Sequence, residues 1–346
     1  MAIGRRASAF ASTAVTQVRA GSGRALSTSA AAQQRTYRDT IPNLALGPSS
    51  RVLLLNATGR ASTLHAKLSL SLGTNIVGGT SSKSTHPDAE LSQKFPLFPD
   101  VRTAVRELGG VDAAAVFVPP SAAADAVLEC IEEEIPTVVA VAEGIPTRDQ
   151  MRVMAALHSQ SKSRYLGANS PGYTNPRGAR LGIAPVAAAS PGCIGIAARS
   201  GTLSYEAMGA TKDLGLGQSY CLGLGGDAYP GTRTDEALEF LLNDPTTKGI
   251  IIVGEVGGTM EEDVSTYLDS LPSPPSKPIV GFIAGLGVPE GRSYGHSGAI
   301  YHDGSAHSAL QKRKRWMASG VRVTGTIGET AMAIKEEMDR LGIKYP

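Results

Sequence analysis

Cysteine, aromatic side chains and long apolar runs are all scarce in this chain of 346 residues. The three cysteines stand far apart and form no CxxC pair, so neither a disulfide scaffold nor a zinc finger is supported. No uninterrupted apolar run approaches the roughly eighteen residues that cross a bilayer, so we expect no membrane span. A P-loop is also absent, and we therefore expect no nucleotide site of that kind in this chain.

Acidic residues are missing before Asp39, whereas the same stretch holds six arginines among many Ala, Ser and Thr. This composition is typical of a mitochondrial transit peptide, which lacks acid and the long apolar core of a secretory signal. A disordered basic tail is the alternative. We expect a leader over residues 1–40 and a mature protein in the mitochondrial matrix. Without the six arginines the net charge falls from +2 to −4, which argues against a nucleic-acid partner.

Glycine is abundant, with 40 residues, and it punctuates two series of short apolar runs that alternate with helix-like segments. Continuous apolar runs between helices predict α/β domains with parallel sheets covered on both faces. The Pro- and Ala-rich stretch 184–192 separates the series and predicts a linker. The first series covers residues 51–55, 75–77, 114–118 and 137–141, and the second covers 193–197, 220–224, 249–253, 278–283 and 321–324.

Ligands of open parallel sheets bind beyond the carboxyl ends of the strands, so the loops there are the candidate sites. The first loop, residues 56–64, places Gly59 and small residues where backbone amides can approach a phosphate. A dinucleotide-binding dehydrogenase would need an acidic residue at the end of the second strand. Gly78 and Gly79 stand there instead, which disfavours that function.

A loop of the second half opens a helix at residues 199–206. Ser200 and Thr202 are suited to cap it, and Gly201 permits close backbone approach. The unpaired amides and the helix dipole would attract an anion. An ordinary well-capped helix explains the same residues equally well.

His296 stands between two glycines in a loop after the apolar run 278–283. Flanking glycines leave an imidazole uncrowded, as a group that accepts a phosphoryl or acyl centre requires. A lone histidine is more often structural. Glu255 leaves a buried strand into a Gly-rich turn, where it is suited either to hold an imidazole tautomer or to face solvent.

Two polar clusters receive simpler interpretations. The basic run 312–315 predicts a solvated helix face, with an anionic partner site as the alternative. His302, Asp303 and His307 have suggestive spacing, but no ligand set accompanies them, so a mobile polar loop is favoured and we predict no metal site.

Taken in order, these loops resemble the alpha subunit of succinate-CoA ligase over residues 45–343. The strongest matches are RSGTLSYEA, GLGQSYCLGLGGDAYPGT, GEVGG, GFIAG and GHSGAI, all in the second half. The resemblance implies an N-terminal Rossmann-like CoA-binding domain over residues 45–184. A flavodoxin-like ligase domain carrying the phosphohistidine would follow over residues 192–343.

The resemblance also implies an acid-thiol ligase of the tricarboxylic acid cycle that works with a beta subunit. ATP or GTP with Mg²⁺ on the beta subunit would phosphorylate His296, the phosphoryl group would pass to succinate, and CoA would then displace phosphate to give succinyl-CoA. Glu255 would orient His296. The residues implied to bind phosphate or substrate are Ser200, Gly201, Thr202 and Tyr205.

The implied CoA site comprises Thr58, Gly59, Arg60, Ala61, Lys83, Val141, Ala142 and Glu143. The family loop resembles GFTGxxGTFH, and Asn56 and Ser62 replace two of its glycines. Where such a glycine serves a positive dihedral or a close ligand approach, a side chain costs about 1–2 kcal/mol or blocks contact. In the segment GANSPG, Ser170 stands where the family has cysteine.

These departures keep a second hypothesis open, a diverged paralogue that assembles with the beta subunit but binds CoA weakly, uses another acid, or lacks catalysis. A stand-alone CoA-binding regulatory module is a third, disfavoured because the second half matches better. The sequence indicates neither which acid is used nor whether ATP or GTP is preferred.

Overall fold

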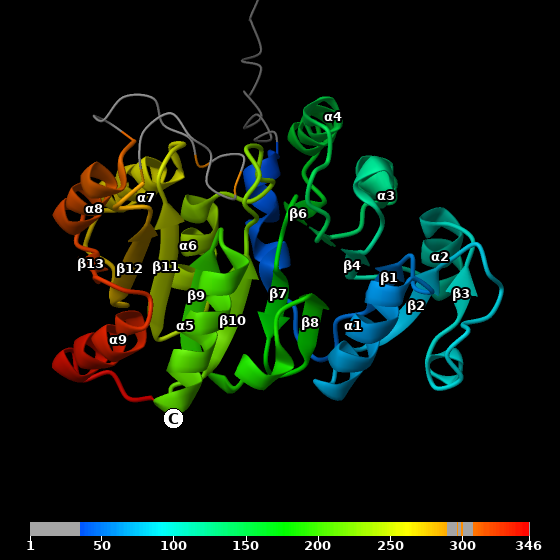
Figure 1. Cartoon of the computed structure of the whole chain (residues 1–346), viewed down its shortest axis with the longest axis horizontal. Helices are drawn as coiled ribbons and strands as arrows, with labels where there is room; N and C mark the ends of the chain where they lie inside the picture. The colour runs from blue at the N-terminus through cyan, green and yellow to red at the C-terminus, as the bar shows by residue number, and fades with distance from the viewer. Residues whose placement is uncertain (1–34, 289–295, 297–298, 300–306, 346) are drawn as a thin grey trace, which may run out of the picture. The chain divides into compact units, whose positions relative to one another are not determined.

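The computed structural model describes residues 35–288, 296, 299 and 307–345. Its first sheet has six parallel strands in the order β3-β2-β1-β4-β5-β6 (Figure 1). This order is that of the doubly wound dinucleotide-binding folds, and it confirms the predicted Rossmann-like half. The strands are β1 (Val52–Leu55), β2 (Ile76–Thr80), β3 (Leu97–Phe98), β4 (Ala113–Val116), β5 (Thr137–Ala140) and β6 (Arg164–Leu166). The α-helices are α1 (Arg60–Ser71), α2 (Val101–Leu108), α3 (Pro120–Glu132) and α4 (Thr147–His158), with a 3₁₀ turn η2 (Leu91–Gln93).

The second sheet has the order β13-β12-β11-β9-β10-β7-β8. Its five parallel strands follow the flavodoxin-like order 2-1-3-4-5 when counted from β9, which confirms the predicted class of this half. The strands are β7 (Gly172–Asn175), β8 (Ala179–Gly182), β9 (Pro191–Ala198), β10 (Gln218–Gly223), β11 (Gly249–Glu255), β12 (Ile279–Ala284) and β13 (Arg322–Val323). The helices are α5 (Gly201–Asp213), α6 (Thr234–Asn243), α7 (Met260–Ser270), α8 (Ala309–Ala318) and α9 (Glu329–Arg340).

The central strands are continuously apolar because helices cover both faces of the sheet. In β11 every residue is buried. Successive side chains point to opposite faces of the sheet and so pack in different hydrophobic clusters. Ile250 packs in the cluster that contains Trp316 of α8, whereas Ile251 packs with Ile334 of α9. Among the described residues, no helix combines the length and apolarity needed to cross a bilayer.

The β7–β8 hairpin precedes the predicted linker yet belongs to the second sheet. Its strand β7 pairs antiparallel with β10, with Tyr173 opposite Leu222. On the other side, the Arg180 guanidinium of β8 donates to the side chain of Ser69 on α1 at 2.9 Å. The hairpin therefore connects the two sheets. The stretch 184–192 holds a 3₁₀ turn, η3 (Val186–Ala188), and the start of β9.

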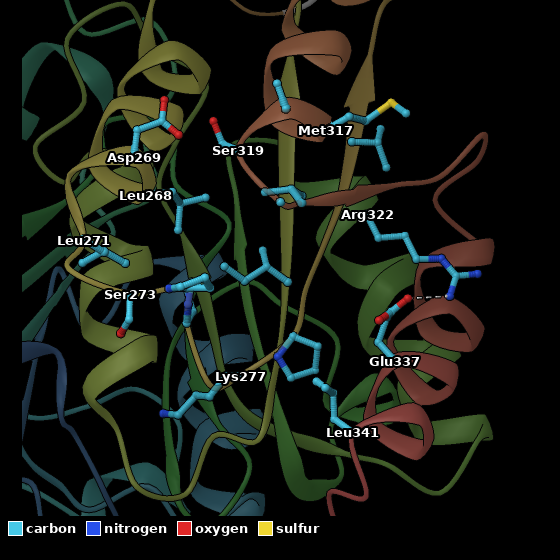
Figure 2. Close-up of a pocket in the computed structure, with 18 of the residues that line it drawn as sticks. Leu268, Asp269, Leu271, Ser273, Lys277, Met317, Ser319, Arg322, Glu337 and Leu341 are labelled. Atoms are coloured by element: carbon cyan, nitrogen blue, oxygen red, sulfur yellow. Dashed lines mark hydrogen bonds and ion pairs between the residues drawn. The ribbon is translucent and has the colours of Figure 1, made fainter.

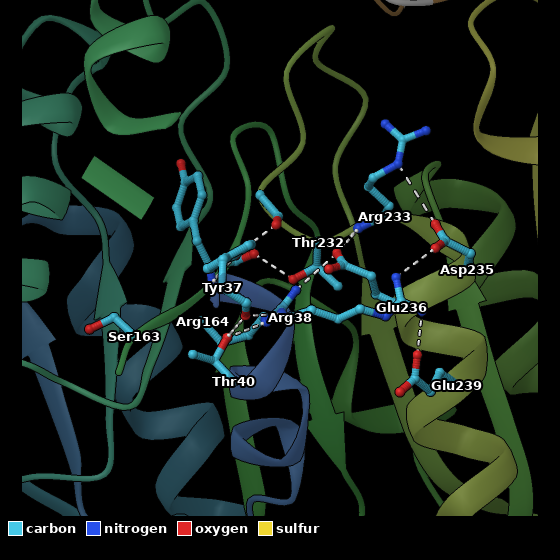
Figure 3. A network of polar contacts seen from close by, with 12 residues as sticks. Tyr37, Arg38, Thr40, Ser163, Arg164, Thr232, Arg233, Asp235, Glu236 and Glu239 are labelled. Carbon is cyan, nitrogen blue, oxygen red and sulfur yellow. Dashed lines mark hydrogen bonds and ion pairs between the residues drawn. The ribbon is translucent and has the colours of Figure 1, made fainter. Parts of the chain in front are cut away.

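A buried polar network ties the first described segment, η1 (Tyr37–Leu44), to both halves (Figure 3). The guanidinium of Arg164 on β6 donates to Thr40 Oγ1 at 2.9 Å, to the Tyr37 carbonyl at 2.8 Å and to Glu236 Oε2 of α6 at 2.9 Å. The Tyr37 hydroxyl donates to the Gly231 carbonyl at 2.6 Å. Tyr37 and Thr40, which the predicted leader includes, are thus buried parts of this fold.

Replacing Arg164 by alanine should lower the free energy of unfolding by about 3–5 kcal/mol, because Glu236 would remain buried without its partner. Denaturant unfolding measures the loss. Arg152→Ala is the matched control, since its ion pair with Asp125 is exposed and should contribute less than about 1 kcal/mol. Equal losses in the two variants would contradict the account of this network.

Candidate active site

Three strands of the second sheet end beside one imidazole. Parallel strands present their carboxyl ends at the same edge, so the residues that follow β9, β10 and β11 converge there. Arg199 follows β9, Gly226 lies beyond β10, and Glu255 ends β11. His296 contacts Glu255 and lies against Gly226, while Arg199 reaches it through Glu255.

The imidazole is held by a carboxylate that is itself paired with a guanidinium. His296 Nδ1 lies 2.6 Å from Glu255 Oε2, and Glu255 Oε1 lies 2.8 Å from an Arg199 terminal nitrogen. The Arg199 and Glu255 side chains are 4% and 9% exposed, whereas the imidazole retains 20% exposure. The pKa of His296 is raised, mainly because of the hydrogen bond with Glu255. With Nδ1 engaged by Glu255, a nucleophilic role falls to Nε2.

Glycine at position 226 sets the place of the ring. A Cβ atom added there would stand 2.5 Å from Cγ and 2.6 Å from Nε2 of His296. Such separations are far inside van der Waals contact. Only glycine lets the β10 loop lie against the imidazole.

Asp227, the next residue, connects this loop with the first half of the chain. Its carboxylate accepts a hydrogen bond from Gln150 Nε2 of α4 at 2.8 Å. Burial raises the pKa of Asp227, and a hydrogen bond from the Asn169 side chain opposes the shift. Glu143, a predicted CoA residue, raises the pKa of both Asp227 and His296. Glu143 therefore lies within electrostatic range of the imidazole.

Helix α5 begins beside this cluster. Ser200 caps it as predicted, its hydroxyl accepting the Leu203 N–H at 3.5 Å. A Cβ at Gly201 would lie 3.5 Å from the Tyr205 hydroxyl, so the Tyr205 ring folds back over the helix start. Burial raises the pKa of Tyr205 to about 12, which keeps the phenol neutral. Contact between the amides of Ser200, Gly201 or Thr202 and a phosphoryl group on His296 stays a prediction.

The predicted CoA residues follow three strands of the first sheet. Thr58–Ala61 lie after β1 with Gly59 as the N-cap of α1, Lys83 lies after β2, and Val141–Glu143 follow β5. The first two loops touch, because Thr58 Oγ1 lies 2.8 Å from Ser81 Oγ. Solvent reaches the side chains of Arg60, Lys83 and Glu143.

The two departures from the family loop are built into its backbone. Asn56 has φ +55°, the left-handed conformation that glycine takes without strain and asparagine tolerates best among the other residues. Its side-chain amide donates to the Phe117 carbonyl at 2.8 Å. Ser62 is buried, and its hydroxyl donates to the Asn56 carbonyl and to the Gly59 carbonyl at 3.2 Å. Both side chains therefore brace the loop from within.

An Asn56→Gly, Ser62→Gly double variant should change the Kd for CoA by less than about fivefold, or about 1 kcal/mol, because neither side chain points out of the loop. Calorimetric titration of CoA measures it. Asn56→Ala is the control for strain at φ +55° and should destabilise the chain by about 1–2 kcal/mol. A large gain in CoA affinity of the double variant would instead favour the diverged-paralogue hypothesis.

The prediction of a solvated basic face on α8 is wrong for its first residue. Lys312 is fully buried, pairs with the Glu261 carboxylate and donates to the Gly257 carbonyl. The reason is helical periodicity, since Lys312 and Trp316 share the inward face of α8. Lys314 and Arg315 are exposed as expected.

The sequence analysis assigned no role to Arg199, Gly226, Asp227 or Glu261. Arg199 was detectable, because it stands one position before the predicted cap at the end of a strand. Gly226 and Asp227 follow β10 within the segment GLGQSYCLGLGGDAYPGT, which matches the family, but no function was inferred for either residue.

No group of three metal-binding side chains occurs among the described residues. His302 and Asp303 lie outside the described residues. His307 Nδ1 lies 3.1 Å from Glu262 Oε1.

One groove lies where β12 and β13 begin (Figure 2), at the opposite edge of the second sheet from the end of β11, where Glu255 meets His296. It has a volume of about 930 Å³ and is lined where α7, α8 and α9 end and where β12 and β13 begin. The pair between Arg322 and Glu337, 3.2 Å apart, crosses one side of it. Ligands of open parallel sheets bind at the carboxyl ends of the strands, whereas this groove lies at the amino ends of β12 and β13.

Comparison with known proteins agrees with both halves of the fold. Residues 49–144 match the CoA binding domain family and residues 198–321 match the CoA-ligase family. The alpha subunit 2 of the ADP-forming succinate-CoA ligase of Archaeoglobus fulgidus is 36% identical over 83% of this chain and 96% of its own length. The chain belongs to the family of succinate-CoA ligase alpha subunits. It is therefore a CoA ligase subunit by descent.

One relative of similar identity is named for another acid, and one solved structure with this fold contains citrate. The alpha subunit of a malate-CoA ligase from Methylorubrum extorquens is 35% identical over 81% of this chain and 94% of its own length. The structure of ATP citrate lyase from Methanothrix soehngenii, bound to citrate and coenzyme A, shares the fold with a TM-score of 0.75. It is 22% identical, and the match covers 88% of this chain and 52% of that one. Family membership thus leaves the acid open.

Proposed function

We propose that this chain is the alpha subunit of a heteromeric acid-CoA ligase that forms succinyl-CoA from succinate and CoA, with His296 as phosphoryl carrier. The observation that carries the proposal is the chain of contacts Arg199, Glu255, His296 at the carboxyl edge of the second sheet. It presents a histidine with one nitrogen fixed by a carboxylate and with part of its surface open to solvent.

The first step moves a phosphoryl group from ATP or GTP, held with Mg²⁺ by the beta subunit, to Nε2 of His296. Glu255 accepts the Nδ1 proton in a hydrogen bond, which directs the Nε2 lone pair toward the phosphorus. The N–P bond forms as the bond to the leaving nucleoside diphosphate breaks. A phosphorylated imidazole carries about two negative charges near pH 7, and the start of α5 at Ser200, Gly201 and Thr202 offers backbone amides and a positive dipole end.

The second and third steps transfer the phosphoryl group and then the acyl group. A carboxylate oxygen of succinate takes the phosphoryl group from His296 and forms an acyl phosphate. The thiol of CoA then attacks the acyl carbon, loses its proton and releases inorganic phosphate. Tyr205, neutral and folded over the start of α5, would line the acid site. The CoA residues would be those after β1, β2 and β5, with Lys83 meeting a CoA phosphate.

We also propose a mitochondrial matrix location, on the acid-free, Arg-rich composition before Asp39. Removal of a leader that ended after Tyr37 would break the Arg164 network, so we place the cleavage before Tyr37.

The second candidate is the diverged paralogue. The specific observation in its favour is that Asn56, Ser62 and Ser170 all depart from the family at the CoA loop or close to the β10 loop. Ser170 is buried and its hydroxyl donates to the Gly223 carbonyl at 2.7 Å, just before the loop that meets His296.

The test is the overall reaction. The mature chain and a cognate beta subunit are incubated with ATP or GTP, Mg²⁺, CoA and, in separate reactions, succinate, malate or citrate. Formation of acyl-CoA and release of phosphate are measured together. Succinyl-CoA as the main product supports the proposal, whereas malyl-CoA or citryl-CoA would reassign the acid and no acyl-CoA with any acid would favour the paralogue.

A further inference from the structure

A buried ion pair lies beneath the turn that carries Glu255. Lys312 on α8 and Glu261 on α7 are both fully buried, and they stand 51 positions apart in the sequence. The Lys312 ammonium lies 3.6 Å from a second carboxylate, that of Glu262. None of these groups belongs to the reaction centre itself.

Both members of the pair bind the backbone of this turn. Glu261 Oε1 accepts the N–H of Glu255 at 3.0 Å, while its other oxygen binds Lys312. The Lys312 ammonium also donates to the Gly257 carbonyl. The pair therefore binds the turn backbone on both sides of Val256, at the Glu255 N–H and at the Gly257 carbonyl.

The turn is packed closely against this pair. A Cβ atom at Gly254 would stand 2.6 Å from Glu261 Cγ, so the end of β11 lies directly on the carboxylate. The Trp316 indole donates to the Glu261 carbonyl at 2.8 Å and fixes the helix that supplies Glu261. Close packing at Gly254 and the hydrogen bond at the Glu255 N–H therefore restrict the position of the backbone at Glu255.

We propose that Lys312 and Glu261 are positioning residues that fix the Glu255 backbone so that its carboxylate meets Nδ1 of His296. Stability alone does not account for them, because an apolar pair of similar volume generally stabilises a core as well as a buried ion pair. An apolar pair could not supply the two hydrogen bonds that Glu261 and Lys312 make to the backbone of the turn. In its consequence for phosphoryl transfer, the inference rests on the proposed function.

Two double variants separate positioning from stability. Lys312→Met, Glu261→Leu removes both charges and both bonds to the turn, whereas Lys312→Met, Glu261→Gln keeps an oxygen that can accept the Glu255 N–H. Neither leaves Lys312 or Glu261 as an unpaired buried charge, and Glu262, which loses Lys312, is partly exposed and keeps His307 Nδ1 at 3.1 Å. Both variants should therefore fold, and their unfolding midpoints are measured beside that of the wild type. Glu255, Arg199, Glu143 and Asp227, the charged groups that act on His296, are unchanged in both.

The first readout is the pKa of His296, followed by NMR in histidine-labelled protein, with His296→Ala to assign the signal. In the wild type it should lie above the ordinary 6.5. The leucine double variant should bring the pKa back toward that value, and the glutamine double variant should restore much of the elevation. The second readout is transfer of labelled phosphate to His296 with the beta subunit present, expected to fall at least tenfold in the leucine variant.

A leucine double variant that keeps the wild-type pKa of His296 overturns the inference, whatever the phosphorylation assay shows. A pKa that shifts as expected in a chain that is never phosphorylated upholds the positioning role and refutes the proposed function. A variant whose phosphorylation rate merely follows its unfolding midpoint also overturns the inference.

Discussion

Gly226→Ala is expected to reduce phosphoryl transfer to His296 at least about 100-fold, because displacement of a reacting group by about 1 Å commonly costs that much. The added methyl group would stand 2.6 Å from Nε2, and the imidazole must move to relieve the overlap. The three heavy atoms nearest to the added methyl group all belong to the His296 ring. Rapid-quench labelling with nucleoside triphosphate and beta subunit measures the rate.

Gly209→Ala is the matched control. Gly209 lies within α5, and a Cβ there would meet nothing within 4 Å. Alanine should leave phosphorylation unchanged and should slightly stabilise the helix. If both variants are phosphorylated at the wild-type rate, the ring does not lie against Gly226 in the working enzyme.

Glu255→Gln is expected to lower phosphorylation of His296 by about 100- to 1,000-fold, the range found when one preorganised electrostatic contact is removed. The carboxylate raises the pKa of His296 and would stabilise the charge of the phosphorylated ring. The variant also leaves Arg199 buried without an anion, a change that costs several kcal/mol. Adding Arg199→Met should recover stability but not phosphorylation.

The pH dependence gives Glu255→Gln a second signature. Nε2 attacks only when the ring is deprotonated, so the wild-type rate should fall as the pH drops through a pKa above 6.5. In the variant the inflection should move to lower pH. The same raised pKa makes the His296–Glu255 pair contribute to folding stability below about pH 6.5, and this contribution is lost as the pH rises through the folded-state pKa. An inflection at the same pH in both proteins would contradict a direct role of the carboxylate.

The apolar runs predicted the central strands well, because strands buried on both faces carry a signal that needs no partner. The strand order within each sheet was implied only by the family resemblance, since pairing depends on residues far apart in the chain. The β7–β8 hairpin was missed because the buried polar residues Thr174 and Arg180 interrupt its buried apolar ones, so neither strand shows a continuous apolar run. The burial of Arg180 is explained by its hydrogen bonds to the His65 carbonyl and the Ser69 hydroxyl of α1, partners that the local sequence does not reveal.

Some residues of the candidate site were also indicated by the local sequence, whereas their contacts depend on residues far apart in the chain. Glycines around His296 and the turn after Glu255 indicated chemistry, and the structure joins the two side chains across 41 positions. A charge run usually indicates a solvated helix face, but Lys312 is buried because its partner Glu261 lies on another helix. At Asn56 the sequence left two reasons open for the glycine of the family, a positive dihedral or close ligand approach, and the structure shows a positive φ of +55° there.

The most direct measurement of the central claim is the site of phosphorylation. The mature chain is mixed with a cognate beta subunit, Mg²⁺ and nucleoside triphosphate labelled at its terminal phosphate, without acid or CoA. Acid-labile phosphate on the wild-type chain, chased by succinate with CoA and absent from His296→Ala, is the predicted result. Label that persists in His296→Ala, or a wild-type chain that takes up none while its complex with the beta subunit is intact, would contradict it.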